Sequence, residues 1–353
     1  MVEPKKICVV GLGYVGLTLS VVLAEKGFIV YGSTKSEELA EQLRNGKPHF
    51  HERGLDVLLK KFVNKNLFIS AEIPEGIPMD VFIISVGTPL DKTTKKPIIS
   101  HIESAVTDVA KHLRPGNLVV LRSTVPVGLT RSYVLPILQK HQNERFYLAF
   151  APERTIEGKA LSELKYLPQV VGGLDEESLN KASEIFIQVT KTIIRVSSLE
   201  SAEMIKILDN SYRDLTFAFA NEMAMVARHL GLNAVELIEA ANFGYPRTNV
   251  PVPGFVGGAC LEKDPHILID FATNAGYTPR LVAMARTVNE SLPVFTADLV
   301  KKHCVLHGKD IKTAKILVSG LAFKGRPEND DLRGSPTVNL LNCLKEAGAK
   351  NIF

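Results

Sequence analysis

A glycine-rich run near the start of the chain, GLGYVG at residues 11–16, constrains the fold more than any other feature. It follows an apolar run, Ile7–Val10, with the character of a strand, and leads into a helical stretch, Val15–Glu25. In that setting the first glycine permits a tight turn, the second lets the backbone approach a pyrophosphate, and the third lets helix meet strand. The free N–H groups at the helix N-terminus also attract phosphates. The motif therefore predicts a dinucleotide site, with a tight turn without a ligand as the alternative; its candidate residues are Gly11, Gly13, Tyr14, Val15 and Gly16.

The rest of the first half alternates short β-rich runs with helical stretches, which predicts a doubly wound α/β sheet. Further strands are expected at Phe28–Tyr31, Leu67–Ser70, Val81–Val86, Leu118–Arg122 and Tyr147–Ala149. Further helices are expected at Glu37–Arg44 and Ile102–His112, and Ser183–Val196 supplies one more helix and strand.

The pattern changes after residue 198. From Leu199 to about Leu230 the sequence lacks Gly and Pro, which predicts a long helix. Apolar residues at helical spacing predict one buried stripe on it, made of Met204, Ile207, Leu208, Leu215 and Phe219. This helix opens a mostly helical region that reaches His303 and contains a Pro/Gly-rich loop, Tyr245–Ala259.

A short α/β piece closes the chain, with a strand at Lys315–Ser319, a helix at Thr337–Ala347 and a strand beginning at Asn351. So little chain cannot cover both faces of a parallel sheet, so we expect the sequence to stop inside a further domain, truncated or naturally short. The predicted division is a Rossmann-like dinucleotide-binding domain at 1–198, a helical central domain at 199–303, and the beginning of an α/β domain at 304–353.

Composition excludes several classes of protein. Hydrophobic residues make up 45% and charged residues 23%, so the chain can bury a large core and is not disordered. The net charge of +4 is small and the basic residues are dispersed, which predicts no nucleic-acid partner. No apolar run reaches the ~20 residues of a membrane span, and the first residues do not read as a signal peptide. Four cysteines without a CxxC pair predict reduced thiols, a cytoplasmic location and no metal site.

The second half of the dinucleotide fingerprint is missing. An Asp or Glu is expected about 20 residues after the glycines, at the end of the second strand, where it holds the ribose 2′-hydroxyl. Here that strand runs into Gly32-Ser33-Thr34-Lys35-Ser36, and the first acid is Glu37. Thr34 and Lys35 would suit a 2′-phosphate, so NADP is predicted beside NAD as the cofactor. The alternative is that Thr34 bonds the 2′-hydroxyl and Lys35 is solvated.

Two features point to covalent chemistry and oxyanion stabilisation. Cys260 lies in a loop shaped by three glycines and two prolines, close to Lys263, which makes its thiol a candidate nucleophile with a lowered pKa. On the long helix Lys206 and Asn210 stand four residues apart on one face, where they could hold a developing alkoxide. The alternatives are a small buried cysteine and a solvated Lys–Asn pair.

Three further loops begin where predicted strands end, which is the edge at which doubly wound sheets bind ligands. They are Val86–Pro89, Arg122–Gly128 and Ala151–Lys159. The last of them carries two carboxylates four residues apart, Glu153 and Glu157. Convergence of the loops predicts a shared cleft, with ordinary charged loops as the alternative.

As a set, these motifs resemble the UDP-glucose/GDP-mannose dehydrogenase family of nucleotide-sugar 6-dehydrogenases, nearly end to end. Besides GLGYVG, the resemblance rests on VGTP (86–89), STVPVG (123–128), PERTIEGKAL (152–161), AEMIKILDN (202–210), NE (221–222), GGACLEKDP (257–265), ARTVNE (285–290) and FKGRPENDDLRGSP (323–336). It implies a Rossmann-like NAD domain, a helical dimerisation core, and a C-terminal domain for the sugar nucleotide.

The resemblance also implies a mechanism, in which a sugar CH2OH becomes a carboxylate through two hydride transfers to NAD. Cys260 would capture the aldehyde as a thiohemiacetal and then carry a thioester that water hydrolyses. The oxyanions would be stabilised by Lys206 and Asn210, and Asp264 and Thr124 would place or activate water. The acid/base and water-positioning carboxylates would be Glu153 and Glu157, with the choice of proton acceptor left open.

The resemblance also implies which residues bind the cofactor and the substrate. Beyond the glycine turn, the cofactor-binding candidates are Thr34, Lys35, Val86, Gly87, Thr88, Ser123, Thr124, Lys263 and Arg333. The candidates for contact with the UDP-sugar are Glu153, Lys206, Asn210, Arg247, Phe255, Gly257, Phe323 and Lys324. By the same resemblance Arg247 would reach a neighbouring subunit's substrate, so a homodimer or higher homo-oligomer is implied.

The sequence around PERTIEGKALSEL, with LPQVVGG after it and PRTN before the cysteine loop, is similar to the UDP-N-acetylmannosamine branch of the family. We therefore expect a UDP-N-acetylhexosamine as substrate, with UDP-glucose as the alternative. Thr34 departs from the family pattern, and so does Ala259, where Ser or His is usual. A 3-hydroxyacid-type dehydrogenase, which needs no thiol, and a non-catalytic cofactor-binding relative are the remaining alternatives.

Overall fold

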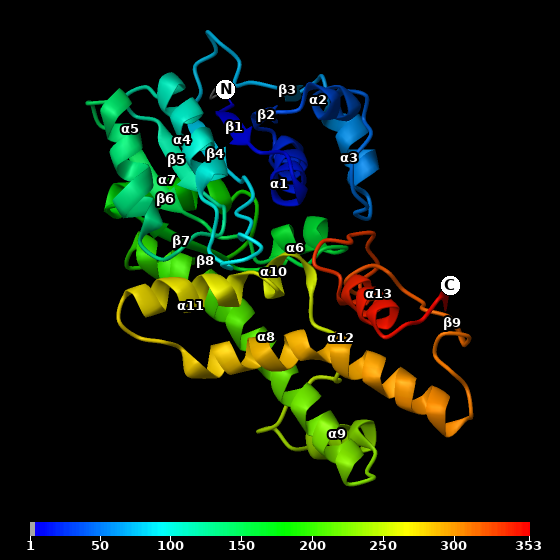
Figure 1. Ribbon diagram of the computed structural model, residues 1–353. Helices are drawn as coiled ribbons and strands as arrows, with labels where there is room; N and C mark the ends of the chain where they lie inside the picture. The colour runs from blue at the N-terminus through cyan, green and yellow to red at the C-terminus, as the bar shows by residue number, and fades with distance from the viewer. Residues whose placement is uncertain (1–3) are drawn as a thin grey trace. The chain divides into compact units, whose positions relative to one another are not determined.

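The computed structural model describes residues 4–353 and divides into two compact units. The first unit ends at Lys206, and the second runs from Ile207 to Phe353 (Figure 1). The predicted division into three domains stays a prediction. Among the residues described, no helix combines the length and the apolar character that crossing a membrane requires.

The first unit is built on an eight-stranded sheet in the order β3-β2-β1-β4-β5-β6-β7-β8 (Figure 1). Every neighbouring pair is parallel except β6 and β7. The order reverses between β1 and β4, which creates the crevice where such sheets bind ligands. The strands are β1 (Lys6–Val10), β2 (Ile29–Ser33), β3 (Leu67–Ser70), β4 (Val81–Ile84), β5 (Leu118–Leu121), β6 (Tyr147–Phe150), β7 (Gln169–Gly173) and β8 (Ile193–Val196).

Helices cover both faces of this sheet, as the predicted doubly wound fold requires. Alternate residues of β1 enter separate cores: Ile7 and Val9 pack in one, Cys8 and Val10 in the other. Burial raises the pKa of Cys8 to about 12, so this thiol is a small core residue. The helices are α1 (Tyr14–Glu25), α2 (Glu37–Arg44), α3 (Leu55–Phe62), α4 (Ser100–His112), the π-helical turn η1 (Thr130–Val134), α5 (Leu135–His141), α6 (Ala160–Tyr166) and α7 (Glu176–Phe186).

Strand β7 has no counterpart among the predicted strands, and α7 begins seven residues before the predicted Ser183. The sequence of β7, QVVGG, ends in two glycines, which depress strand propensity. Packing requires them, because a Cβ on Gly172 would lie 2.2 Å from the Ser198 carbonyl oxygen and one on Gly173 2.5 Å from Leu179 N.

The second unit contains most of the predicted long helix, α8 (Leu199–His229), which begins in the first unit. After it come α9 (Ala234–Asn242), α10 (Gly258–Leu261), α11 (Asp264–Asn274), α12 (Arg280–Leu306), β9 (Lys315–Ile316), α13 (Pro336–Glu346) and β10 (Asn351–Ile352). Strands β9 and β10 pair in parallel, and Cys304 packs with Leu344 in a small core beside them.

The predicted apolar stripe on α8 is wrong. Of its members only Ile207 is fully buried, whereas Leu208 and Phe219 are each 51% exposed. Polar residues at helical spacing occupy the buried face instead: Glu203, Lys206, Asn210, Asp214 and Asn221. Hydrophobic periodicity therefore assigns the wrong face of this helix to the interior. The polar face can be buried because distant segments supply hydrogen-bond partners for its side chains.

Candidate active site

The glycine turn after β1 has the geometry of a phosphate site. Gly11 has φ +92°, and a Cβ there would lie 2.9 Å from a Val86 methyl carbon. A Cβ on Gly16 would lie 1.9 Å from the Gly11 carbonyl oxygen, so helix and strand meet closely there. A Cβ on Gly13 would meet nothing within 4 Å, and no side chain caps α1. The turn thus leaves open space beside uncapped N–H groups, which fits a pyrophosphate.

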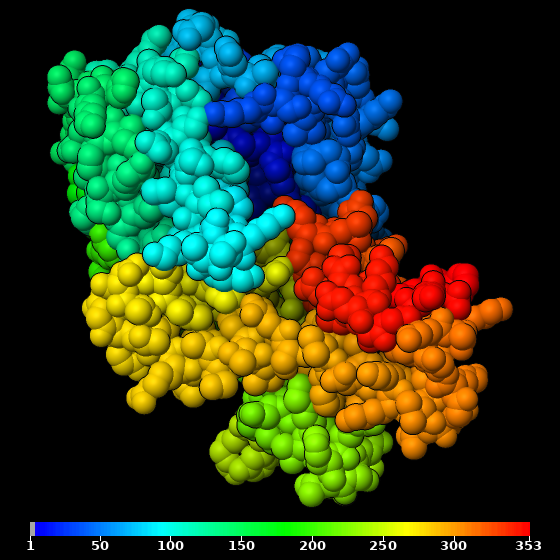
Figure 2. Space-filling model, in the orientation of Figure 1, coloured from blue at the N-terminus to red at the C-terminus, as the bar shows by residue number. Residues whose placement is uncertain are grey.

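A cleft of about 790 Å³ opens at this turn, where the strand order reverses. Figure 2 shows it as a hollow with the dark blue N-terminal segment at its floor. Six of the predicted cofactor-binding residues line it: Gly11, Gly13, Thr34, Lys35, Val86 and Gly87. Nearby, the hydroxyl of Thr88 is buried and has no hydrogen-bond partner within residues 4–353, as expected for a group that awaits a ligand.

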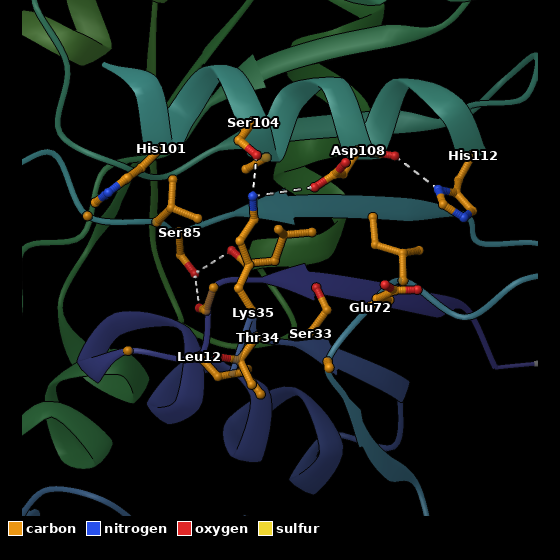
Figure 3. Close-up of a pocket in the computed structure, with 18 of the residues that line it drawn as sticks. Leu12, Ser33, Thr34, Lys35, Glu72, Ser85, His101, Ser104, Asp108 and His112 are labelled. Carbon is orange, nitrogen blue, oxygen red and sulfur yellow. Dashed lines mark hydrogen bonds and ion pairs between the residues drawn. The ribbon is translucent and has the colours of Figure 1, made fainter. Parts of the chain in front are cut away.

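The far wall of the cleft comes from α4 and was not predicted. His101, Ser104, Asp108 and His112 face the cleft from this helix (Figure 3). Their three- and four-residue spacing marks a polar face of a helix, which is the signal that could have identified them. The loop after β3 adds Glu72 and Glu75.

Lys35 reaches across the cleft from the end of β2 to α4 (Figure 3). Its Nζ donates a hydrogen bond to Ser104 Oγ and lies 3.9 Å from Asp108 Oδ2. Asp108 also pairs with Lys111 at 3.0 Å, so its charge is already shared by two lysines. The β2 end therefore offers the cleft hydroxyl groups and an ammonium group, with no acid between Ser33 and Ser36.

The loop after β6 carries Glu153, whose carboxylate is buried against Arg122. The guanidinium donates one hydrogen bond to Glu153 Oε2 and others, both 2.9 Å long, to the Ala151 carbonyl and to Gln169 Oε1. The other carboxylate oxygen accepts from the N–H groups of Arg154 and Thr155, each at 2.8 Å.

Glu153 is held as an anion. Burial alone would raise its pKa, but the charge of Arg122, the Thr155 N–H and the charge of Lys206 outweigh burial and hold the pKa below 4.5. Glu153 and Lys206, two predicted site residues far apart in sequence, therefore lie within electrostatic reach of each other. Lys206 is itself buried on α8.

Glu203, one turn before Lys206 on α8, anchors the loop that carries Thr124. Its carboxylate accepts from Gly128 N at 2.5 Å and from Thr130 N at 2.9 Å. Burial raises the pKa of Glu203, although these bonds oppose the rise. No local sequence pattern reveals this contact, because it joins segments more than 70 residues apart.

In the second unit, Cys260 lies on the short helix α10 and is exposed. The four cysteines of the chain form no disulfide in the described structure. The two glycines before it are packed tightly: a Cβ on Gly258 would lie 2.5 Å from the Phe323 ring, and one on Gly257 2.2 Å from the Gly334 carbonyl oxygen. The segment around Phe323 thus packs directly against the turn that presents the thiol.

Helix α8 holds the cysteine segment on both sides. After the cysteine, Asn210 Nδ2 donates to Asp264 Oδ2 at 2.6 Å, and Lys263 Nζ pairs with Asp264 Oδ1 at 2.7 Å. Before it, Asn221 exchanges two hydrogen bonds with the backbone of Gly254, at 2.7 and 3.0 Å.

Arg286 on α12 completes this support. It is buried, donates to Asp214 Oδ1 at 2.7 Å, and donates to the Leu261 carbonyl, next to the thiol, at 3.2 Å. Asn289 bonds Asp214 and Asn221. Arg286 and Asn289 lie in ARTVNE and Asn221 in NE, but no role was predicted for them or for Asp214; the signal in the sequence is polar residues repeating at helical spacing.

Three other predicted binding residues contact neighbours one or two positions away in the sequence. Arg247 lies over the Tyr245 ring, 4.4 Å from its centroid, and donates to its hydroxyl at 2.9 Å. Arg333 pairs with Asp331, and Lys324 lies 5.2 Å from the Phe323 ring centroid. Phe255 is partly exposed. No cluster of His, Cys, Asp and Glu suited to a metal ion occurs within the part of the chain described.

Sequence comparison connects both units to known proteins. The NAD binding domain of the UDP-glucose/GDP-mannose dehydrogenase family matches residues 5–190, and the central domain of the same family matches residues 200–291. A UDP-N-acetyl-D-mannosamine dehydrogenase of Methanococcus maripaludis is 35% identical over 351 residues, covering 98% of this chain and 78% of the relative. An NDP-N-acetyl-D-galactosaminuronic acid dehydrogenase of Ralstonia nicotianae is 34% identical, covering 97% and 81%.

Structure comparison agrees. The structure of a UDP-D-ManNAc dehydrogenase from Pyrococcus horikoshii superimposes with a TM-score of 0.92 at 34% identity. The match covers 99% of this chain and 82% of that one.

Proposed function

This chain belongs to the UDP-glucose/GDP-mannose dehydrogenase family, as an NAD-dependent nucleotide-sugar dehydrogenase, and from that premise we propose that it oxidises C6 of a UDP-N-acetylhexosamine to the carboxylate. UDP-N-acetylmannosamine is the first candidate substrate, supported by the names of the relatives at 34–35% identity. The observation that carries the proposal is Cys260, an exposed thiol on a turn that buried α8 and α12 residues hold in place.

The proposed reaction is two oxidations and one hydrolysis. NAD, when bound, accepts one hydride at each oxidation, so two equivalents are reduced per carboxylate formed. The Cys260 sulfur adds to the C6 aldehyde, and the former carbonyl oxygen takes a proton to give a thiohemiacetal. Loss of a second hydride and of that proton gives the thioester. Water then adds its oxygen to C6 as the C–S bond breaks, which releases the carboxylic acid and returns a proton to the Cys260 sulfur.

The polar residues divide the remaining work. We assign Lys206 and Asn210 to the developing oxyanions, and Asp264 and Thr124 to the water that attacks the thioester. The Asn210–Asp264 hydrogen bond supports a shared role. Glu153, ionised beside Arg122 and Lys206, supplies a fixed negative charge, and Glu157 is the second carboxylate of the same loop. We propose that the UDP-sugar is bound by Arg247, Phe255, Gly257, Phe323 and Lys324. The dinucleotide is proposed to contact Lys263 and Arg333.

A panel of UDP-sugars tests the proposal, read by absorbance of the reduced nicotinamide and by product mass. The expected result is two reduced cofactors per uronate, with UDP-N-acetylmannosamine turned over faster than UDP-glucose. The reverse order would make this chain a UDP-glucose 6-dehydrogenase. One reduced cofactor per substrate would favour 3-hydroxyacid-type chemistry, and cofactor binding without turnover would indicate a non-catalytic relative.

The finer cofactor proposal is that NADP binds as well as NAD. With Ser33, Thr34 and Lys35 at the β2 end, no carboxylate stands there to repel a 2′-phosphate, and Lys35 is already in the cleft. We expect Kd for NADP within about tenfold of Kd for NAD, because the Lys35 ammonium group offers the 2′-phosphate a charged contact that offsets the cost of desolvating it. Isothermal titration measures both.

Two variants separate the contributions to this cofactor preference. Thr34→Asp should weaken NADP at least about tenfold relative to NAD through charge repulsion. Lys35→Met should weaken NADP alone, while Lys92→Met, an exposed lysine elsewhere in this unit, should change neither. Tight NAD binding with no detectable NADP binding in the unchanged protein would contradict the proposal that both cofactors bind.

We also propose that a second copy of this chain covers the exposed apolar face of α8. Leu208, Tyr212, Phe219 and Val226 recur on that face at helical spacing, each 46–64% exposed. Leu208→Glu with Phe219→Glu should raise the dimer dissociation constant at least about 100-fold, since each buried side chain contributes about 1.5–3 kcal/mol.

Light scattering after gel filtration measures this dissociation. Leu281→Glu, at the exposed start of α12, is the matched control and should leave association unchanged. A monomeric unchanged protein, or a double variant that still dimerises at the same concentration, would place the interface elsewhere.

A further inference from the structure

The first residue of α1 is bonded to the loop that carries the proposed acid/base carboxylates. Tyr14 donates its hydroxyl hydrogen to Glu52 Oε2. The N–H of Gly158 is shared between Glu52 Oε2, at 2.7 Å, and Tyr14 Oη, at 2.9 Å. Three segments, GLGYVG, the stretch before α3 and the PERTIEGK loop, therefore meet at one point in the first unit.

Burial and the neighbouring carboxylates keep the Tyr14 phenol protonated. Glu52 is only 5% exposed. Burial chiefly, and then the carboxylates of Glu52 and Glu157, raise the pKa of Tyr14 well above its usual value of 10. The phenol therefore stays protonated and acts as the donor to Glu52. The effect of Glu157 on Tyr14 also puts that carboxylate within electrostatic reach of the phenol.

The shared N–H fixes the backbone of the carboxylate loop. It belongs to the peptide unit between Glu157 and Gly158, so the bond orients the main chain directly after Glu157. Gly158 has φ +88°, and Glu163 Oε2 accepts from Ile156 N at 2.7 Å. Arg122 holds Glu153 at the other end of the loop. The Tyr14–Glu52 pair joins the loop to the phosphate-binding turn through the Gly158 N–H.

We propose that Tyr14 and Glu52 are positioning residues that couple occupation of the glycine turn by a dinucleotide to the ordering of Glu157. Tyr14 is the first residue of α1, directly after the N-cap Gly13 that faces the open phosphate space. A pyrophosphate seated there restrains the first turn of α1, and Tyr14 passes that restraint to the loop. The catalytic meaning rests on the proposed function, whereas the coupling itself does not.

Tyr14→Phe is the sharpest test, because it removes the hydroxyl and keeps the ring that packs on Phe50, 4.7 Å between centroids. Hydrogen exchange of residues 153–159 is measured with and without NAD, together with Kd for NAD. In the unchanged protein NAD should slow exchange about 3–10-fold, the range for one hydrogen bond. In Tyr14→Phe that protection should vanish, and NAD should bind more weakly by the same factor, because coupling is reciprocal.

Further variants sharpen the test. Glu52→Gln should behave like Tyr14→Phe, and the double variant should be no worse than either single one. Tyr277→Phe, an exposed tyrosine, should leave the exchange and the affinity unchanged. For oxidation of the UDP-sugar, the fold decrease in kcat should exceed the fold increase in KM.

Equal NAD protection of residues 153–159 in Tyr14→Phe and the unchanged protein would overturn the inference. So would an absence of protection by NAD in the unchanged protein. If no UDP-sugar is oxidised at all, the proposed function fails, but exchange and affinity still decide whether the turn and the loop are coupled.

Discussion

Cys260→Ser should stop formation of the carboxylate product, lowering kcat on the order of 10³-fold or more, while NAD binds within about twofold of its normal affinity. A serine hydroxyl is a far weaker nucleophile than a thiolate, so neither the captured aldehyde nor the thioester forms at a useful rate. Binding should survive because Cys260 is not among the residues that line the cofactor cleft, and the substitution leaves the proposed dinucleotide contacts Lys263 and Arg333 in place.

The measurement is carboxylate detected by mass, with isothermal titration for NAD. Supplying the C6 aldehyde directly isolates the second oxidation, which should also be lost. Cys343→Ser, a partly buried thiol on α13, serves as the matched control and should keep full turnover. Unchanged carboxylate formation in Cys260→Ser would show that the sulfur is not the nucleophile.

Arg122→Met should destabilise the protein by about 3–5 kcal/mol at pH 7, because it leaves Glu153 buried and without its cation. Urea unfolding measures the loss. Arg131→Met, which breaks the exposed pair with Glu200, should cost at most about 1 kcal/mol. A loss from Arg122→Met no larger than that of the control would mean that the Glu153 carboxylate is not held by Arg122.

The pH dependence follows from the depressed pKa of Glu153. Because the folded pKa lies below the unfolded value near 4.5, this group stabilises the fold above pH 4.5 and loses that contribution as pH falls through the folded pKa. Arg122→Met removes the largest of the interactions that lower this pKa. The stability difference between the two proteins should therefore be largest at neutral pH and narrow in acid.

Local sequence signals predicted the phosphate turn well and its surroundings poorly. GLGYVG between a strand and a helix is a short-range pattern, and the structure has the turn where the glycines require it. The α4 wall of the cleft depends on the reversal of strand order between β1 and β4, which no local pattern contains. Glu52 was missed for the same reason, since its partners Tyr14 and Gly158 lie 38 and 106 residues away.

The error on α8 has a different physical origin. Hydrophobic periodicity assigns the apolar face to the interior, but Asp214 and Asn221 are buried because Arg286, Asn289 and Gly254 provide partners for them. A buried polar face requires knowledge of those distant segments. Lys206 and Asn210, by contrast, are candidates that their four-residue spacing indicates directly, whereas Asp264 is a candidate only through the family resemblance; the structure joins Asn210 to Asp264 by a hydrogen bond.

The close packing of Phe323 and Gly334 on the two glycines before the thiol bears on how the chain can be divided. A fragment ending at Leu306 would contain the whole first unit and the proposed catalytic set, yet it would lack the aromatic ring that fills the space over Gly258. Its reactive turn would stand uncovered on one side. Residues after Leu306 therefore contribute to the packing that shapes the turn before Cys260.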